Sequence, residues 1–72
     1  MTEKGRIFWA AVLGSYTRAR RNPRQTFKNL GKSQTTYYNR ANNPESLTVE
    51  ELKALIKEGR VPEEDVIKFL YQ

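Results

Sequence analysis

Prolines and glycines interrupt this 72-residue chain at short intervals, and apolar residues recur at helical spacing between the interruptions. Before the first proline, four apolar residues fall at i, i+3, i+4 and i+7, which is one face of a helix. They are Trp9, Val12, Leu13 and Tyr16, and Ile7 and Phe8 widen this face at its start. The spacing predicts a first helix from Arg6 to about Arg20, with residues 1–5 as a frayed, disordered tail.

Helix-boundary residues divide the middle of the chain into two short helices. Asn22 is followed by a proline, which disfavours helical dihedrals at Asn22 and suits the first position of a new helix. This helix is predicted over residues 23–30, and Gly31 fits the position after its end, where a positive φ is needed. Ser33 can cap a third helix over residues 34–41.

The second half of the chain carries stronger helix signals. Thr48 and Glu51 form a capping box, and the apolar residues that follow at helical spacing end at Gly59. Pro62 opens a last helix. Its predicted buried face consists of Val66, Ile67, Phe69 and Leu70. The stretch "NNPES" over residues 42–46 is a loop by composition, and no strand signal of comparable strength is present. We therefore predict an all-α fold, a compact bundle of about five short helices in one domain.

The composition bounds the chemistry. The chain has no cysteine and no histidine, which removes thiolate ligands, the commonest metal ligand and the commonest general base. There is no nucleophile–base pair and no glycine-rich phosphate loop, so we expect neither an enzyme nor a cofactor, metal or small-molecule ligand. The longest apolar run, "IFWAAVLG", is too short to cross a membrane and lacks a cleavage site, so we interpret it as a core helix.

Charge is distributed unevenly along the chain. Residues 1–43 hold nine basic residues and one acid, whereas residues 44–72 hold four basic and seven acidic residues, for a net charge of +5 overall. The acids of the second half cluster at helix starts, where they stabilise the positive helix ends, so we interpret them as caps and not as catalytic acids. The basic half predicts a polyanionic partner that binds one side of the molecule.

The stretch "NLGKSQTTYYNRANNP", residues 29–44, is unusually polar for the middle of a small domain. On a helix, Tyr37 and Ala41 lie one turn apart and form an inner face. Two outer rows pair Gln34 with Tyr38 and Thr35 with Asn39. Glutamine and asparagine can make two-point hydrogen bonds to adenine, and threonine can meet a base edge or a thymine methyl. These four outer residues are therefore our candidate base contacts in double-stranded DNA.

This stretch, followed by "SLTVEELKALI", resembles the helix-turn-helix of the phage-repressor and Cro-like (XRE) regulators. The resemblance covers a turn glycine (Gly31), a serine cap, a reading helix and an Asn-rich loop. It implies a lambda repressor-like fold, a transcriptional regulator in the cytoplasm of a bacterial or phage-infected cell, associated with the nucleoid, and base contacts by Gln34, Thr35 and Asn39. The chain departs from the family pattern at Thr26, Phe27, Lys32 and Arg40.

The flanking residues supply candidate phosphate contacts. They are Arg18, Arg20, Arg21, Arg24, Lys28, Lys32, Arg40 and, as the resemblance implies, Asn42. Specificity usually needs two protomers, so the apolar end of the last helix predicts a homodimer. Two alternatives stay open. One is a protein-interaction module, either antitoxin-like or a phage-encoded inhibitor. The other is an RNA-binding protein that stacks bases on Trp9, Tyr37 or Tyr38, although we expect Trp9 and Tyr37 in the core.

Overall fold

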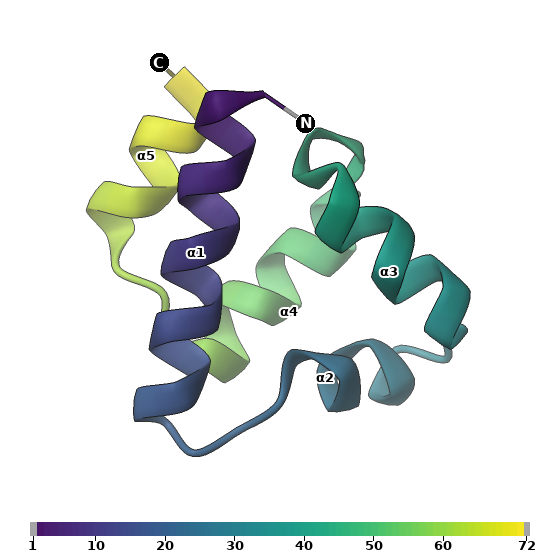
Figure 1. Cartoon of the computed structure of the whole chain (residues 1–72). Helices are drawn as coiled ribbons and strands as arrows, with labels where there is room; N and C mark the ends of the chain where they lie inside the picture. Colours follow the sequence, from purple (N-terminus) through teal and green to yellow (C-terminus); the bar gives the residue numbers. More distant parts are fainter. Residues whose placement is uncertain (1, 72) are drawn as a thin grey trace.

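Helices account for all regular secondary structure in the computed structural model, which describes residues 2–71. They are α1 (Glu3–Arg18), α2 (Pro23–Asn29), α3 (Gln34–Asn42), the 3-10 helix η1 (Pro44–Ser46), α4 (Val49–Gly59) and α5 (Glu63–Tyr71). The predicted all-α bundle of about five helices is therefore confirmed. In Figure 1, α1 and α5 lie side by side with α4 behind α1, while α2 and α3 form the opposite end of the molecule.

Side-chain caps begin four of the five α-helices. The predicted caps Ser33 and Thr48 are confirmed, because their hydroxyls accept the backbone N–H groups of residues 36 and 51 at 3.1 and 3.2 Å. Thr2 caps α1, and Asn22 caps α2 by accepting a backbone N–H at 2.9 Å. Each such cap stabilises its helix by about 1 kcal/mol, which matters in a domain of this size.

Several predicted boundaries differ in detail, most clearly in α1 and in the "NNPES" stretch. Helix α1 begins at Glu3 and ends at Arg18, so residues 3–5 are helical and not a tail, while Met1 lies outside the described residues. The Thr2 cap explains the early start, because it gives the first turn a partner for an otherwise unpaired N–H. The "NNPES" stretch is not wholly a loop, since it contains η1.

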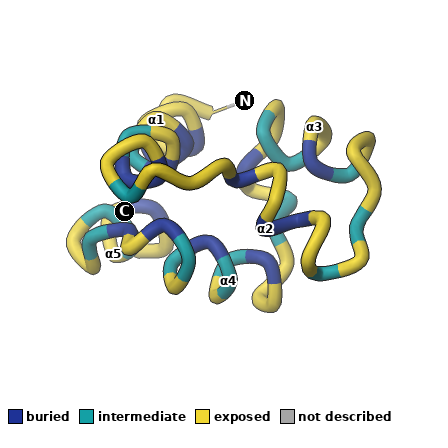
Figure 2. Tube along the Cα trace, turned by 90° about the horizontal axis from the view of Figure 1, so that it is seen from below, coloured by how far each residue is buried: buried dark blue, intermediate teal, exposed yellow. Residues whose placement is uncertain are grey.

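Aromatic side chains dominate the core. The buried apolar residues are Phe8, Trp9, Val12, Tyr16, Phe27, Tyr37, Leu55, Val61 and Phe69. The prediction for α1 was correct for Phe8, Trp9, Val12 and Tyr16 but wrong for Ile7 and Leu13, which are exposed. The buried stripe of α1 also includes Gly5 and Ser15, so the helix is rotated away from both aliphatic residues. Figure 2 shows that the buried residues lie on the inner sides of the helices.

The last helix buries less than its pattern predicts. Phe69 is buried and stacks on Phe8, with ring centroids 4.2 Å apart. Val66 is half-buried and packs against the core, whereas Ile67 and Leu70 are exposed. Because α5 packs mainly against α1, only a narrow stripe of its surface is covered. The predicted four-residue buried face is thus reduced to Phe69 and part of Val66.

The turn between α4 and α5 depends on a glycine in close contact with a ring. Helix α4 ends at Gly59 as predicted, but the left-handed backbone position is the next residue, Arg60, with φ 54°. Gly59 is buried, and a Cβ there would collide with the ring of Tyr16. Glycine is required at this position for close approach, and not for a positive φ.

Candidate nucleic-acid interface

The connection between α2 and α3 is a tight turn that sets where α3 begins. Gly31 adopts a positive φ of 77°, as predicted for the position after α2. The backbone N–H groups of Gly31 and Lys32 donate to the carbonyls of Lys28 and Phe27, both at 3.0 Å. These bonds satisfy carbonyls at the end of α2 and direct the chain straight into the Ser33 cap of α3.

Tyr37 anchors the inner face of α3 in the core. Its side chain is 8% exposed, and its ring meets Phe27 edge-on with centroids 5.5 Å apart. Its centroid also lies 5.9 Å from that of Trp9, which connects α3 to α1. Ala41, one turn further on, packs against the same cluster. The predicted inner face of α3 is therefore confirmed.

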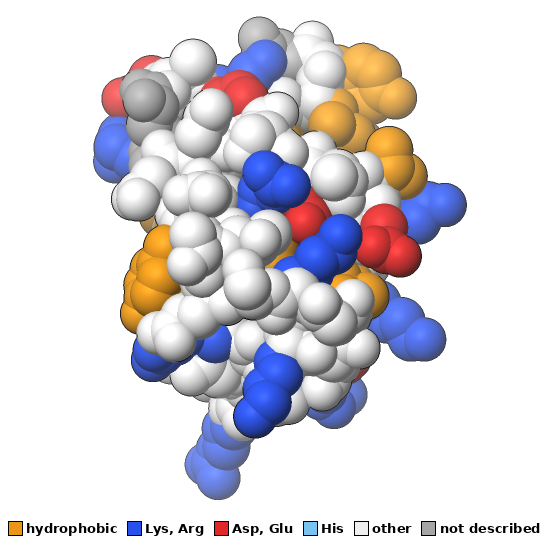
Figure 3. Space-filling model, turned by 90° about the vertical axis from the view of Figure 1, so that its right-hand side faces the viewer, with side chains coloured by type: hydrophobic (Ala, Val, Ile, Leu, Met, Phe, Trp, Pro, Cys, Tyr) orange, Lys and Arg blue, Asp and Glu red, His pale blue; other side chains and the backbone are white. Residues whose placement is uncertain are grey.

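The outer face of α3 presents uncharged hydrogen-bonding groups. Gln34, Thr35, Tyr38 and Asn39 are all exposed, as is Asn42 at the end of the helix. Gln34 Nε2 and Arg24 Nη1 both donate to the Tyr38 hydroxyl, at 3.4 and 3.3 Å. The Gln34 hydrogen bond and the nearby Arg24 guanidinium lower the pKa of Tyr38. Figure 3 shows one side of the molecule, where basic and acidic side chains lie together near the centre, uncharged groups surround them, and further Lys and Arg side chains lie below.

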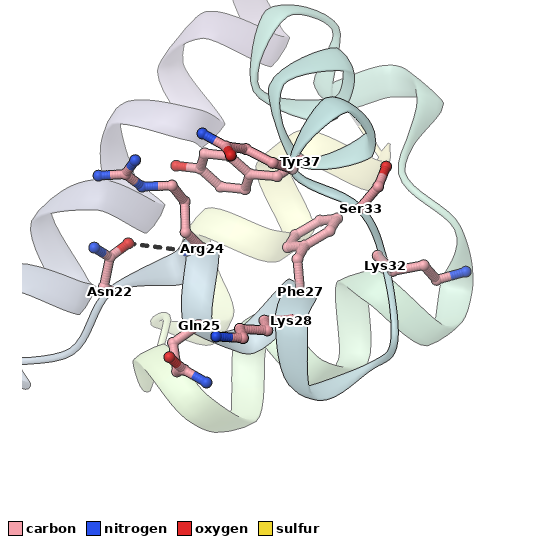
Figure 4. Close-up of a pocket in the computed structure, with 9 residues that line it drawn as sticks. Asn22, Arg24, Gln25, Phe27, Lys28, Lys32, Ser33 and Tyr37 are labelled. Carbon is pink, nitrogen blue, oxygen red and sulfur yellow. Dashed lines mark hydrogen bonds between the residues drawn. The ribbon is translucent and has the colours of Figure 1, made fainter.

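A groove of about 480 Å³ separates α3 from α2. It is lined by Asn22, Arg24, Gln25, Phe27, Lys28, Lys32, Ser33, Gln34 and Tyr37. Every charged lining residue is a cation, and the remaining polar groups are amides and hydroxyls. In Figure 4, the rings of Phe27 and Tyr37 lie at the centre of the groove, Lys28 and Gln25 lie below them, and Lys32 extends away to one side. The arrangement offers positive charge beside the uncharged face of α3.

The candidate phosphate contacts divide into two groups. Arg24 and Lys28 are exposed in the groove, and Arg18 and Arg20 are exposed at the end of α1. The other three cations make ion pairs: Arg21 lies 2.9 Å from Glu58, whereas Lys32 and Arg40 both turn toward Glu51. The structure thus brings part of the predicted set to the groove and commits another part to contacts within the protein.

Glu51 is the functional candidate that sequence reasoning treated only as a helix cap. The predicted capping box is confirmed, because Thr48 N–H donates to Glu51 Oε1 at 2.9 Å. The same carboxylate is fully buried and also accepts from Arg40 Nε at 2.8 Å. A signal was present in the sequence, since Lys32 and Arg40 occupy positions where the resemblance leads one to expect apolar residues.

Opposing effects determine the charge state of Glu51. Burial raises the pKa of this carboxyl group, but the Thr48 backbone hydrogen bond and the cations Arg40 and Lys32 together outweigh burial. The pKa therefore lies below its ordinary value of 4.5, and the group is ionised at neutral pH. Thr26, another position at which the chain departs from the resemblance, bonds through its hydroxyl to that of buried Tyr16 at 2.7 Å.

Comparison of the chain with protein-family models, with curated protein sequences and with solved structures gives no significant match. None of the helices within residues 2–71 is both long and apolar enough to span a bilayer.

Proposed function

We propose that the protein is a sequence-specific double-stranded DNA-binding regulator that reads the major groove with the outer face of α3. The observation that carries the proposal is the exposed, uncharged hydrogen-bonding face of Gln34, Thr35, Tyr38 and Asn39, beside a groove lined only by cations among its charged residues. A major groove of about 12 Å width admits a single helix. Helices α2 and α3 then act as the helix-turn-helix of a repressor or Cro-like protein.

The amides of α3 supply the base-reading chemistry. Gln34 lies in the first turn of α3, where a reading helix usually meets base edges. Gln34 and Asn39 can each make a two-point hydrogen bond to adenine, and Thr35 can contact a thymine methyl. Buried Tyr37 supports this role, because it fixes the rotation of the helix and keeps the outer residues turned to solvent.

Exposed cations of α2 and of the end of α1 supply affinity without sequence information. Four of the predicted phosphate contacts make no ion pair within residues 2–71: Arg18, Arg20, Arg24 and Lys28. If these four contact phosphates, log affinity falls with log salt concentration with a slope of about −3.6 per protomer. Asn42, exposed at the end of α3, can donate to a further phosphate without changing this slope.

A second protomer completes the proposal, because one reading helix covers few base pairs. A groove of about 360 Å³ between α1 and α5 is lined by Ile7, Phe8 and Phe69, with acids and lysines at its edges. Those edge residues are Glu3, Lys4, Asp65 and Lys68. An edge with both signs of charge suits a two-fold contact between identical surfaces, so we propose a homodimer through α5.

The test begins with selection from randomised duplexes, followed by binding measurements on the selected and a scrambled duplex. Gln34→Ala should cost about 1–3 kcal/mol on the selected duplex and little on the scrambled one. Lys28→Ala is the matched control in the same groove and should weaken both complexes equally, while reducing the salt slope by about 1. Equal losses on both duplexes for Gln34→Ala would exclude the base-reading role.

Single-stranded RNA belongs in the same experiment. Two of the three aromatic residues considered for base stacking, Trp9 and Tyr37, are buried, which leaves only Tyr38 exposed for that purpose. We therefore expect duplex DNA to bind more tightly than RNA at equal salt. Tighter binding of RNA, or no binding of any nucleic acid, would favour the RNA-binding protein or the protein-interaction module instead.

A further inference from the structure

A carboxylate is buried where α3 meets α4. The side chain of Glu51 is 0% exposed, and its Oε1 accepts hydrogen bonds from Arg40 Nε at 2.8 Å and from Thr48 N–H at 2.9 Å. Its Oε2 has no hydrogen-bond partner among the described residues and lies 4.0 Å from Lys32 Nζ. Burial of a charge is costly unless it is paired, so this carboxylate depends on its two cations.

The two cations that meet at Glu51 come from opposite ends of α3. Lys32 belongs to the turn before α3, and Arg40 belongs to the last turn of α3. Apart from this ion cluster, α3 packs mainly against α2 and η1. Glu51 on α4 therefore holds α3 near both of its ends, and the exposed Gln34, Thr35 and Asn39 lie between the two attachment points.

The ion cluster of Glu51, Lys32 and Arg40 also makes two cations less accessible at the surface. The side chains of Lys32 and Arg40 are only 32% and 25% exposed, and both point to an acid on α4. Arg40 commits its Nε–H to this carboxylate, so a phosphate contact that drew the guanidinium away would weaken the pairing of a buried charge, which is unfavourable. This geometry argues against the phosphate-contact role that the sequence suggested for these two cations.

We propose that Glu51 is a positioning residue for DNA recognition, because its buried carboxylate holds Lys32 and Arg40 and thereby sets the orientation of α3. The inference rests on the proposed function and deepens it. Glu51 thus contributes to recognition although it is buried and cannot touch DNA. Lys32 and Arg40, predicted as phosphate contacts, instead pair with this carboxylate inside the protein. Lys32 and Arg40, two positions at which the chain departs from the family pattern, then share one role, which is to pair with Glu51.

The sign of the effect distinguishes positioning from simple electrostatics. Removal of an acid from a protein that binds a polyanion strengthens binding through long-range charge. Loss of orientation weakens binding to the correct site and leaves binding to scrambled DNA unchanged or slightly tighter. Glu51→Gln keeps the shape and the hydrogen-bond acceptor for Thr48 while it removes the charge.

Glu50→Gln is the matched control. Glu50 precedes Glu51 on α4 and also pairs with Lys32, at 3.7 Å, but its side chain is 66% exposed. Both variants change the net charge equally. We expect Glu51→Gln to lower affinity for the selected duplex about ten- to a hundredfold, the range for a lost charged hydrogen bond, while Glu50→Gln does not lower it. Equal effects of the two variants would overturn the proposal.

Arg40→Gln provides a second, independent measurement and replaces Glu51→Gln if that variant does not fold. If Arg40 is a positioning residue, Arg40→Gln should lower affinity for the selected duplex without changing the slope of log affinity against log salt concentration. A slope reduced by about 0.9 would identify Arg40 as a phosphate contact and would overturn the proposal.

Amide hydrogen exchange tests, in the absence of DNA, whether Glu51 holds α3 in place. Failure of the positioning proposal can therefore be distinguished from failure of the proposed function. In Glu51→Gln, or in Arg40→Gln if the first variant is unfolded, exchange should accelerate about tenfold or more in α3, while amides of α1 keep their protection. Unchanged protection in α3, or an equal loss in both helices, would overturn the positioning role even if the protein binds DNA. Absence of DNA binding by the wild-type chain would instead exclude the proposed function.

Discussion

The core around α1 and the outer half of α3 are built on opposite principles. The first packs aromatic rings from four helices, including Phe8 on Phe69 and Trp9 beside Tyr37. The second exposes amides and hydroxyls and is attached by one buried tyrosine and one ion cluster. Stability and the proposed recognition are therefore carried by different side chains. Substitutions can therefore change one without the other.

The largest contrast is expected between two neighbouring tyrosines. Tyr37 is 8% exposed and Tyr38 is 44% exposed, although they are adjacent on α3. Tyr37→Ala should lower the free energy of unfolding by about 3–5 kcal/mol, because it removes a ring from the core and leaves a cavity. Tyr38→Ala should change stability by less than about 0.5 kcal/mol. Urea denaturation followed by circular dichroism measures both values.

Tyr38→Ala should affect DNA binding without affecting stability. Tyr38→Ala removes an exposed phenol that Gln34 and Arg24 both contact, so it should weaken binding to the selected duplex in a fully folded protein. Similar losses of stability for the two tyrosine variants would contradict the division of α3 into an inner and an outer face.

A second, smaller effect is expected within the core itself. Gly59→Ala should destabilise by about 1–3 kcal/mol, because the added methyl meets the ring of Tyr16 in a packed interior. Gly14→Ala is the control, since its nearest non-local atom, on Arg18, is 3.5 Å away. That change should stabilise α1 by about 0.5–1 kcal/mol through helix propensity alone. Thermal unfolding of both variants should show melting temperatures shifted in opposite directions.

Most of the fold could be predicted from local signals. Ser33, Thr48 and Gly31 marked helix ends correctly, because a cap or a positive φ depends on the few residues around it. Leu13 and Ile67 were assigned to the core wrongly. An apolar pattern defines a broad helical face, but the neighbouring helices decide which part of that face is covered, and a single sequence does not show where those neighbours lie.

The candidate site divides in the same way. The exposure of Gln34 and Asn39 was predictable, because Tyr37 and Ala41 define the opposite face of one helix. The internal role of Arg40 was not, because it depends on a carboxylate from another helix. Charge counts along the chain could not reveal the ion pair between Arg40 and Glu51. This pair makes Arg40 less available for contact with DNA phosphates.

A third contrast concerns acid pH. Burial raises the pKa of Glu51, but hydrogen bonds and neighbouring cations lower it by more than burial raises it. The pKa in the folded state therefore lies below 4.5. Unfolded protein then binds the proton more readily, and the stability contributed by Glu51 is present above pH 4.5 and lost as pH falls through the folded pKa. The stability difference between wild type and Glu51→Gln should therefore narrow as pH is lowered from about 7 to about 3.

Other acids do not obscure this measurement. Glu3 and Glu45 also have lowered pKa values, through hydrogen bonds with Arg6 and Thr2, but both remain in the variant and cancel in the difference. A difference that stays constant across this range would mean that the carboxylate gains nothing from its cations in the folded state.

The smallest effect on stability is expected at the groove between α1 and α5. Ile7 lines this groove and is 51% exposed, so Ile7→Glu should change monomer stability by less than about 0.5 kcal/mol. If two copies associate through this surface, the same change should convert a dimer to a monomer in sedimentation experiments at high concentration, because a carboxylate would be buried against its own copy. Glu63→Gln, at the exposed start of α5, is the control and should leave the mass unchanged. The opposite result is a wild-type chain that sediments as a monomer both alone and on a duplex with two half-sites. It would exclude the homodimer, and the protein would then bind DNA as a single copy.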